Sequence, residues 1–436
     1  MEDEIPFEVP EGWAWCKLND IYNFIDYRGA TPTKITNGIP LVTAKNVKSG
    51  YIDYTIDDYI SEEEFKERQQ RGISKKGDIL FTTEAPLGNA ALADMEKFSA
   101  GQRLITFQQY GSKNELINYV MLMFILSDFF QQQLYVNKTG STVAGIKAAI
   151  LKTLWIPVPP YNEQLRISNT LKSAINLIDS ISKNKEILST SISNTKSKIL
   201  DLAIRGKLVP QDPNDEPASV LLERIRAEKE ELIKQGKIKR DKKESVIFKG
   251  DDNSYYGIHL PDSWNWASLR EIALSISDGS HNPPPNNGSG IPLLSAANIN
   301  DNSILMNEIS RWITNEEWKI ENQRTNIEVG DVLLTIVGSI GRSAVVQNNN
   351  HFALQRSVAV IKPCLINPLY LMHIVQSPQI QKWLTDNSKG TAQKGIYLNA
   401  LSLMIIPIPP LAEQARIVEL IHIAYKQLDL ISNALL

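Results

Sequence analysis

The chain contains an internal duplication, which constrains its fold more than any other feature of the sequence. VPEGWAWCKL, starting at Val9, aligns with LPDSWNWASL, starting at Leu260, at an offset of roughly 250 residues. The matches keep the same order along the chain. They pair IPLVTAKNV (39–47) with IPLLSAANI (291–299), KGDILFT (76–82) with VGDVLLT (329–335), and WIPVPPYNEQLRI (155–167) with IIPIPPLAEQARI (405–417). An ordered self-match of this kind predicts two copies of one domain.

Each copy has the pattern of a mixed α/β domain. Short β-branched runs such as GDILFTT and GDVLLTIV alternate with polar helical stretches such as ISEEEFKERQQ. A pair of prolines ends each pattern, because proline cannot donate to a strand ladder. We therefore predict α/β domains over residues 1–158 and 248–408.

A heptad pattern follows each domain, over 159–204 and again over 409–436. Apolar residues recur at alternating spacings of four and three, which is typical of a coiled coil. Because a long helix with one apolar seam needs a partner, we expect the two helices to pack on each other. The seam positions are Ile167, Leu171, Ala174, Ile178, Ile181, Leu188, Ile192, Ile199 and Leu202, then Ile417, Ile421, Ala424, Leu428, Ile431 and Leu435.

A polar connector lies between the copies, over residues 205–247. Pro217 is a good helix start, and Gly236, after a Glu/Lys-rich run, is a good helix end. The sequence leaves open whether this helix is only a solvated tether or also docks a partner.

Composition places the chain among globular proteins, with 42% hydrophobic and 22% charged residues. The two cysteines, Cys16 and Cys364, cannot build a disulfide framework, the N-terminus resembles no secretory signal, and no apolar stretch is long enough to span a bilayer. We expect a cytoplasmic protein without a membrane role. The net charge of -3 counts against nucleic-acid binding, although a basic surface can exist within an acidic chain.

Several segments partly match catalytic motifs. Neither these segments nor the matching segments in the other copy have the full set of residues that the motifs require. The Asn-Pro-Pro-Pro step at 282–285 lacks the aromatic ring that stacks on a flipped base in adenine methyltransferases. GSTVAGIK at 140–147 departs from a phosphate-binding loop, and the matching segment GTAQKGIY has Tyr397 in place of Lys147. The five histidines have no metal-site spacing, and no GxGxxG motif is present. We therefore predict no catalytic, cofactor or metal residues.

Three features together resemble the specificity subunits of type I restriction-modification systems. They are the paired Gly-Ser/Thr-x-x-x-Gly-Ile loops at 140–146 and 390–396, the paired Ile-Pro-x-Pro-Pro-x-x-Glu-Gln-x-Arg-Ile helix starts, and the connector GKLVPQDPNDEPASVLLERIRAEKEEL. The resemblance covers nearly the whole chain. It implies two target recognition domains, joined by long antiparallel coiled-coil helices in a pseudo-two-fold arrangement.

The resemblance also implies what the chain binds. Each recognition domain would bind one half of a split target in double-stranded DNA. The partners would be two adenine methyltransferase subunits and two restriction/translocase subunits. S-adenosylmethionine, ATP and Mg would be bound by those partners and not by this chain.

Candidate DNA contacts come from residue types that bind base edges, on loops anchored by the repeat. They are Arg28, Lys45, Asn46, Arg103, Ser141, Thr142, Lys147, His281, Ser295, Asn298, Arg356, Thr391 and Lys394. For the Ser/Thr-Gly loops, helix capping is an equal alternative. For Arg103 and Arg356, a buried structural role is at least as well supported.

Two other functions remain open at this point. The Asn-Pro-Pro-Pro step would fit a standalone methyltransferase or nuclease. The acidic net charge would fit a duplicated protein-interaction scaffold that does not bind DNA.

Overall fold

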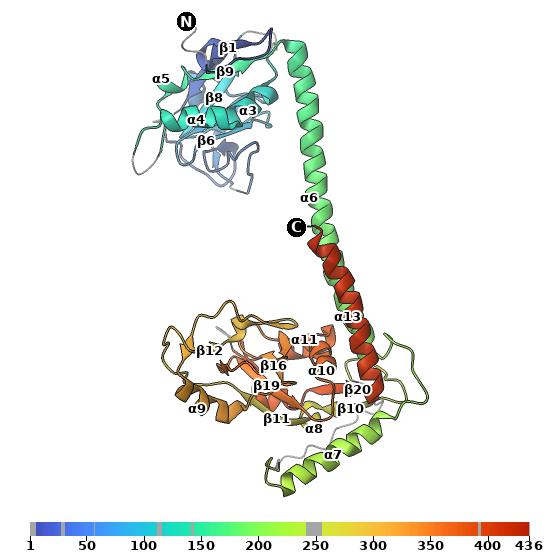
Figure 1. Cartoon of the computed structure of the whole chain (residues 1–436). Coiled ribbons are helices and arrows are strands. Elements are labelled where there is room, and N and C mark those ends of the chain that lie inside the picture. The colour runs from blue at the N-terminus through green and yellow to red at the C-terminus, as the bar shows by residue number, and fades with distance from the viewer. Residues whose placement is uncertain are drawn as a thin grey trace. The chain divides into compact units, whose positions relative to one another are not determined.

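The computed structural model describes residues 6–27, 31–55, 57–110, 116–140, 144–240, 255–390 and 394–435. The chain forms two compact units, residues 1–182 and 183–436. Helix α6, Tyr161–Ile204, is continuous over 44 residues and contributes to both units (Figure 1). Each unit contains one copy of the duplicated domain.

The first domain is built from three small sheets with helices packed around them. Its sheets have the strand orders β2-β8-β5-β6, β4-β3-β7 and β1-β9. The strands are β1 Ala14–Lys17, β2 Tyr22–Asp26, β3 Ile39–Val42, β4 Tyr59–Ile60, β5 Ile79–Thr83, β6 Leu87–Leu92, β7 Ser99–Ala100, β8 Leu104–Gln109 and β9 Trp155–Val158. The helices before α6 are α1 Leu18–Ile21, α2 Glu62–Arg68, η2 Gln69–Arg71, α3 Asn118–Leu126, α4 Asp128–Val136 and α5 Ala148–Leu151.

The second domain repeats this topology, with sheets β11-β19-β16-β17, β15-β12-β18 and β10-β20. It also has the hairpin β13-β14, at the place where the first domain has the single bridge between Val47 and Ile52. Its strands are β10 Asn265–Ser268, β11 Ala273–Asp278, β12 Ile291–Leu294, β13 Ile299–Asn300, β14 Ser303–Ile304, β15 Trp312–Ile313, β16 Val332–Thr335, β17 Ser343–Val345, β18 Ala353–Leu354, β19 Val358–Pro363 and β20 Ile405–Ile408. The helices are α7 Ala218–Lys234, α8 Leu269–Ile272, η3 Ala296–Asn298, α9 Asn315–Thr325, α10 Pro368–Val375, α11 Pro378–Asp386, α12 Leu398–Leu401 and α13 Leu411–Asn433. The duplicated mixed α/β fold is confirmed.

Each domain is closed where its first strand pairs with its last. β1 runs antiparallel to β9, and β10 runs antiparallel to β20. The glutamine of each Glu-Gln step then fastens the following helix to the domain. Gln164 accepts from the Ile117 amide at 2.8 Å, and Gln414 accepts from the Asn367 amide at 2.9 Å. The repeated motif is therefore partly structural.

In the second unit, α13 packs antiparallel to the later part of α6. Lys196 forms an ion pair with Asp429, and the Tyr425 hydroxyl donates to the Lys196 carbonyl at 3.3 Å. Ile192 and Ile417 of the predicted seam are buried. Earlier in α6, however, Ile178 and Ile181 are 60% and 58% exposed, so the seam is covered over only part of its length.

The connector helix follows the sequence prediction. α7 begins after Pro217 and ends before Gly236, which has φ of 70°. Ala218, Leu221, Leu222 and Ile225 are buried in the core of the second unit. At its C-terminal end, Lys229 donates to the carbonyls of Arg270 and Ala273 at 2.8 and 2.9 Å. The helix is therefore an integral part of this unit and not a free tether.

Candidate nucleic-acid interface

In the second domain, several loops meet at the turn formed by residues 354–357. The Arg356 amide donates to the Ser280 carbonyl at 2.9 Å, which fixes the loop that contains His281. The Ala296 amide donates to Ser357 Oγ at 3.0 Å, and the Ile336 amide donates to the Ser357 carbonyl at 2.9 Å. One turn thus connects three loops that are distant in sequence.

The loop with the Gly-Ile step joins the same place. Gly395 forms a bridge with Val337, and the Gly338 amide donates to the Lys394 carbonyl at 3.1 Å. The Ile396 side chain is buried at 3% exposure, which anchors the loop in the core. One loop cluster is therefore formed by residues 280–281, 295–297, 336–342, 354–357, 389–390 and 394–397.

The first domain has the matching loop cluster, made of residues 43–46, 83–86, 101–104, 139–140 and 144–147. The Gly101 amide donates to the Val42 carbonyl at 2.7 Å, and the Thr83 amide donates to the Arg103 carbonyl at 2.9 Å. The Ile146 amide then donates to the Thr83 carbonyl at 3.0 Å. The duplication therefore preserves the hydrogen bonds that assemble the cluster.

The structure describes most of the predicted DNA-contact residues and brings them together, separately in each domain, at these clusters. Those with exposed side chains are Lys45, Arg103, Lys147, His281, Arg356 and Lys394. Arg28, Ser141, Thr142 and Thr391 lie outside the described residues. The alternative of a buried role for Arg103 and Arg356 is wrong, because both are exposed.

Two predicted contacts, Asn46 and Asn298, need correction. Each is 3% exposed. Asn46 accepts from the Thr43 amide at 3.0 Å and donates to the Asp53 carbonyl at 3.0 Å. Asn298 repeats this arrangement, accepting from Ser295 and donating to the Glu308 carbonyl. Because both amide edges are used to hold a turn, neither residue is available to bind a base.

Ser295 is also used within the protein. It is half-buried, and its hydroxyl accepts from the Ala297 amide at 3.3 Å as the cap of η3. A base contact would have to share this hydroxyl with the turn. The structure therefore gives Ser295 a role in holding the turn.

Charge at the clusters differs between the copies. In the first, Arg103 has φ of 67° and its Nε lies 3.1 Å from Glu84 Oε1, so part of its charge is balanced by this acid. The residue equivalent to Glu84 in the second copy is Val337, which brings no charge near Arg356. His281 Nε2 lies 2.8 Å from Asp278 Oδ2, and Asp278 also pairs with Arg324. Among the described residues, no acid forms an ion pair with Arg356, whereas Arg103 pairs with Glu84.

Arg342 is an exposed cation that the sequence prediction missed. It follows the turn 336–341, and its amide donates to Thr335 Oγ1 at 3.0 Å. Its mate is Asn89, which donates to the Val47 carbonyl at 3.0 Å. The sequence contained a signal for this cation. Between two matched strands, the first copy has Asn89 and the second copy has Arg342.

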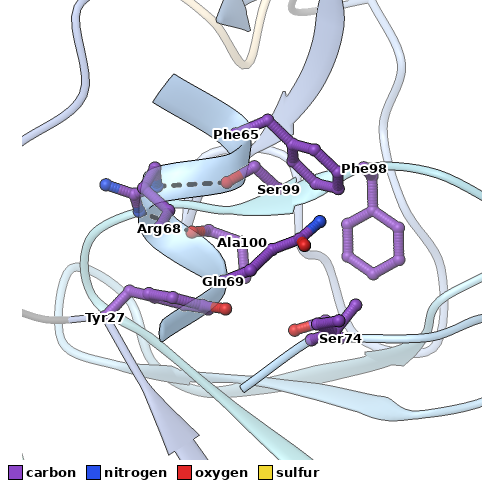
Figure 2. A pocket seen from close by; sticks show the side chains of 9 residues that line it. Tyr27, Phe65, Arg68, Gln69, Ser74, Phe98, Ser99 and Ala100 are labelled. Carbon is purple, nitrogen blue, oxygen red and sulfur yellow. Dashed lines mark hydrogen bonds between the residues drawn. The ribbon is translucent and has the colours of Figure 1, made fainter. Parts of the chain in front are cut away.

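A small pocket in the first domain is lined by Tyr27, Arg68 and Ser99 (Figure 2). Arg68 is held by hydrogen bonds to Ser99 Oγ at 3.1 Å and to the Ala100 carbonyl at 2.9 Å. Among the described residues, no group of His, Cys, Asp and Glu could hold a metal ion, and no helix could cross a membrane.

Comparison with known families identifies the class of protein to which this fold belongs. The model of the type I restriction modification DNA specificity domain matches residues 10–189 and 261–435, which is most of the chain. The chain belongs to this family. The two matched segments coincide with the two copies of the duplicated domain and their helices.

Individual relatives match over nearly the full length. The specificity subunit of the EcoBI type I restriction enzyme from Escherichia coli is 23% identical over 434 residues, covering 98% of this chain and 82% of the relative. That of EcoEI, also from Escherichia coli, is 26% identical and covers all of this chain and 81% of the relative. The HsdS subunit from Thermoanaerobacter tengcongensis has the same fold, with a TM-score of 0.55 at 18% identity over 98% of this chain and 93% of that one.

Proposed function

We propose that this chain is the non-catalytic subunit that recognises a two-part DNA target, with one α/β domain bound to each half. The observation that carries the proposal is the pair of matched loop clusters. Both are assembled by equivalent backbone hydrogen bonds, and both present exposed cations. Arginine and lysine at such positions can bind phosphates and the edges of guanines.

Duplication also fits the symmetry of the ligand. A DNA duplex has two antiparallel strands, and two like domains joined through antiparallel helices can bind it as a dimeric repressor does. The clusters differ at mate positions, as Lys147 against Tyr397 and Asn89 against Arg342 show. Different side chains on one scaffold allow the two half-targets to have different sequences.

The partners supply the chemistry in this proposal. Two methyltransferase subunits would bind S-adenosylmethionine and methylate adenines, and two restriction/translocase subunits would use ATP and Mg. The specificity subunit would place these enzymes on the target in the cytoplasm. The acidic net charge is compatible with this role, because local cations at the clusters govern contacts with phosphate.

The proposal is tested by DNA binding of the chain assembled with its methyltransferase subunits. We expect affinity to fall steeply with rising salt, and a split adenine-containing motif to lose methylation in the host when the gene is deleted. Salt-independent or absent binding in the assembled complex would favour the interaction scaffold. Methyl transfer to DNA by the purified chain alone would show that it is itself an enzyme.

A further inference from the structure

In the second unit, the connector after α6 fills a site around Trp264. The Trp264 ring is 4% exposed, and its indole Nε1 donates to Glu413 Oε2 at 2.9 Å. Gln211 of the connector donates to the other carboxylate oxygen of Glu413 at 2.6 Å. Glu413 is fully buried, so the connector completes the hydrogen bonding of a carboxylate that has no access to water.

Further contacts hold the connector in this site. Arg416 pairs with Asp215 through both guanidinium nitrogens, and Ser263 donates to Gln211 Oε1 at 3.1 Å. Gly206, with φ of 64°, packs so closely on Pro261 that an added Cβ would lie 2.5 Å from its ring. The connector segment in this site thus turns at Gly206 and then presents Gln211 and, four residues later, Asp215.

The first unit has residues equivalent to those that hold the connector in the second unit. Trp13, Glu163 and Arg166 are the mates of Trp264, Glu413 and Arg416. The local geometry matches, because the Trp13 amide donates to the Pro10 carbonyl at 3.0 Å as the Trp264 amide does to the Pro261 carbonyl.

No segment among the described residues completes this first site. Trp13 Nε1 is buried, yet it has no hydrogen-bond partner in the part of the chain that the structure describes. Trp13 and Glu163 are half-exposed and Arg166 is exposed, in contrast to the covered mates. A buried indole N–H without an acceptor is destabilising, and a bound segment would relieve this by ordering Glu163 against it.

The adjacent part of α6 also exposes an apolar face. Leu177, Ile178 and Ile181 are 61%, 60% and 58% exposed. In the second unit the equivalent helix, α13, packs on the later part of α6, which leads directly into the connector. Leu428, which matches Ile178, is partly buried there, whereas Ile431, which matches Ile181, is 46% exposed. The first site therefore matches an occupant that consists of a helix followed by an extended segment.

We infer that Trp13, Glu163 and Arg166 form a docking site for a partner subunit that presents a helix followed by a connector-like segment. The segment would place a carboxamide against Glu163 and a carboxylate against Arg166, as Gln211 and Asp215 do in the second unit. A second copy of this chain is a poorer occupant, since its own connector is already held by Trp264, Glu413 and Arg416.

The test uses the full chain with its tryptophan indole groups labelled with ¹⁵N, and Trp13→Phe to assign the Trp13 signal. The probe is a synthetic peptide that copies residues 205–217. We expect the peptide to shift the Trp13 signal in a saturable manner and to leave the Trp264 signal unchanged, because that site is filled. A peptide with Gln211→Ala and Asp215→Ala should bind at least about tenfold more weakly.

A covalent graft keeps the test decisive if the free peptide binds too weakly. A copy of residues 187–240 is appended after Leu436, where it continues the repeat, and a matched graft carries Gln211→Ala and Asp215→Ala in the appended copy. The Trp13 signal should shift only with the first graft, and Arg166→Gln should reverse the shift. An unchanged Trp13 signal in the grafted chain would overturn the inference. A Trp13 shift that appears on concentrating the unmodified chain would instead identify a second copy as the occupant and overturn the assignment to a partner subunit.

Discussion

Trp264 in the second domain is covered by the connector, whereas Trp13, at the same position in the first domain, is partly exposed. The residues that fasten each helix to its domain, Gln164 and Gln414, make the same hydrogen bonds in both copies. The contrast separates two kinds of repeated residue. One kind serves the fold within each copy, and the other serves contacts with segments outside the domain.

The strongest way to test the comparison is to exchange one domain. Replacing residues 1–158 with the equivalent domain of a relative should change one half of the methylated target completely and leave the other half intact. The physical reason is that each copy assembles its own loop cluster from its own backbone hydrogen bonds. Methylation-aware sequencing gives the result, and a simultaneous change of both halves would show that the domains do not act independently.

The two glutamates should differ strongly in their effect on stability. Glu413→Ala leaves the buried Trp264 indole and Gln211 without their acceptor, so we expect a loss of about 3 kcal/mol in the free energy of unfolding. Glu163→Ala should cost less than about 0.5 kcal/mol, because that carboxylate is half-exposed. Urea denaturation followed by tryptophan fluorescence measures both. Equal losses would contradict the difference between the two sites.

The two arginines of the clusters should differ in their effect on DNA binding. Arg356→Ala should weaken binding of the assembled complex by about 1–3 kcal/mol if the guanidinium contacts a base. Arg103→Ala should have a smaller effect, because Glu84 already balances part of that charge. Titrations at several salt concentrations distinguish the contacts, since loss of a phosphate contact lowers the salt slope by about one. If Arg103→Ala proves the more damaging change, Glu84 does not weaken the contact of Arg103.

The smallest expected effect concerns pH. The pKa of His373 is lowered to about 4, mainly by burial; a hydrogen bond with Gln376 opposes the shift, and the nearby His422 adds to it. Tyr425 packs against the same ring. The unfolded chain therefore binds a proton near pH 6.5 that the folded chain does not, and stability falls as the pH drops from there towards 4.

His373→Met is the matched variant, because Met123 occupies this position in the first copy. When the pH falls from 7 to 5.5, the second unit of the wild type should lose about 1 kcal/mol more stability than that of the variant. Denaturation curves at the two pH values measure the difference. If wild type and variant show the same pH dependence, His373 is already protonated or is not buried in solution.

Much of the architecture could be predicted from the sequence because repetition and periodicity depend on local order along the chain. The paired Trp-x-Trp and Ile-Pro-x-Pro-Pro segments indicated where each domain starts and ends, and strands β1 and β9 lie at these places. Pro217 and Gly236 likewise predicted the bounds of α7. The heptad predicted both long helices, and the contacts between α13 and the later part of α6 agree with the pairing that it implied.

The direction of individual polar side chains depended on tertiary structure. Asn46 and Arg103 are both polar residues in loops, yet Asn46 is held inside by the carbonyl of Asp53 and Arg103 is exposed beside Glu84. Residue type alone could not distinguish them, because hydrogen-bond partners and burial are set by segments that folding brings together. The sequence by itself determined two copies of an α/β domain with a helix after each. Only tertiary packing decided which of their polar groups hold the turns and which remain exposed for a ligand.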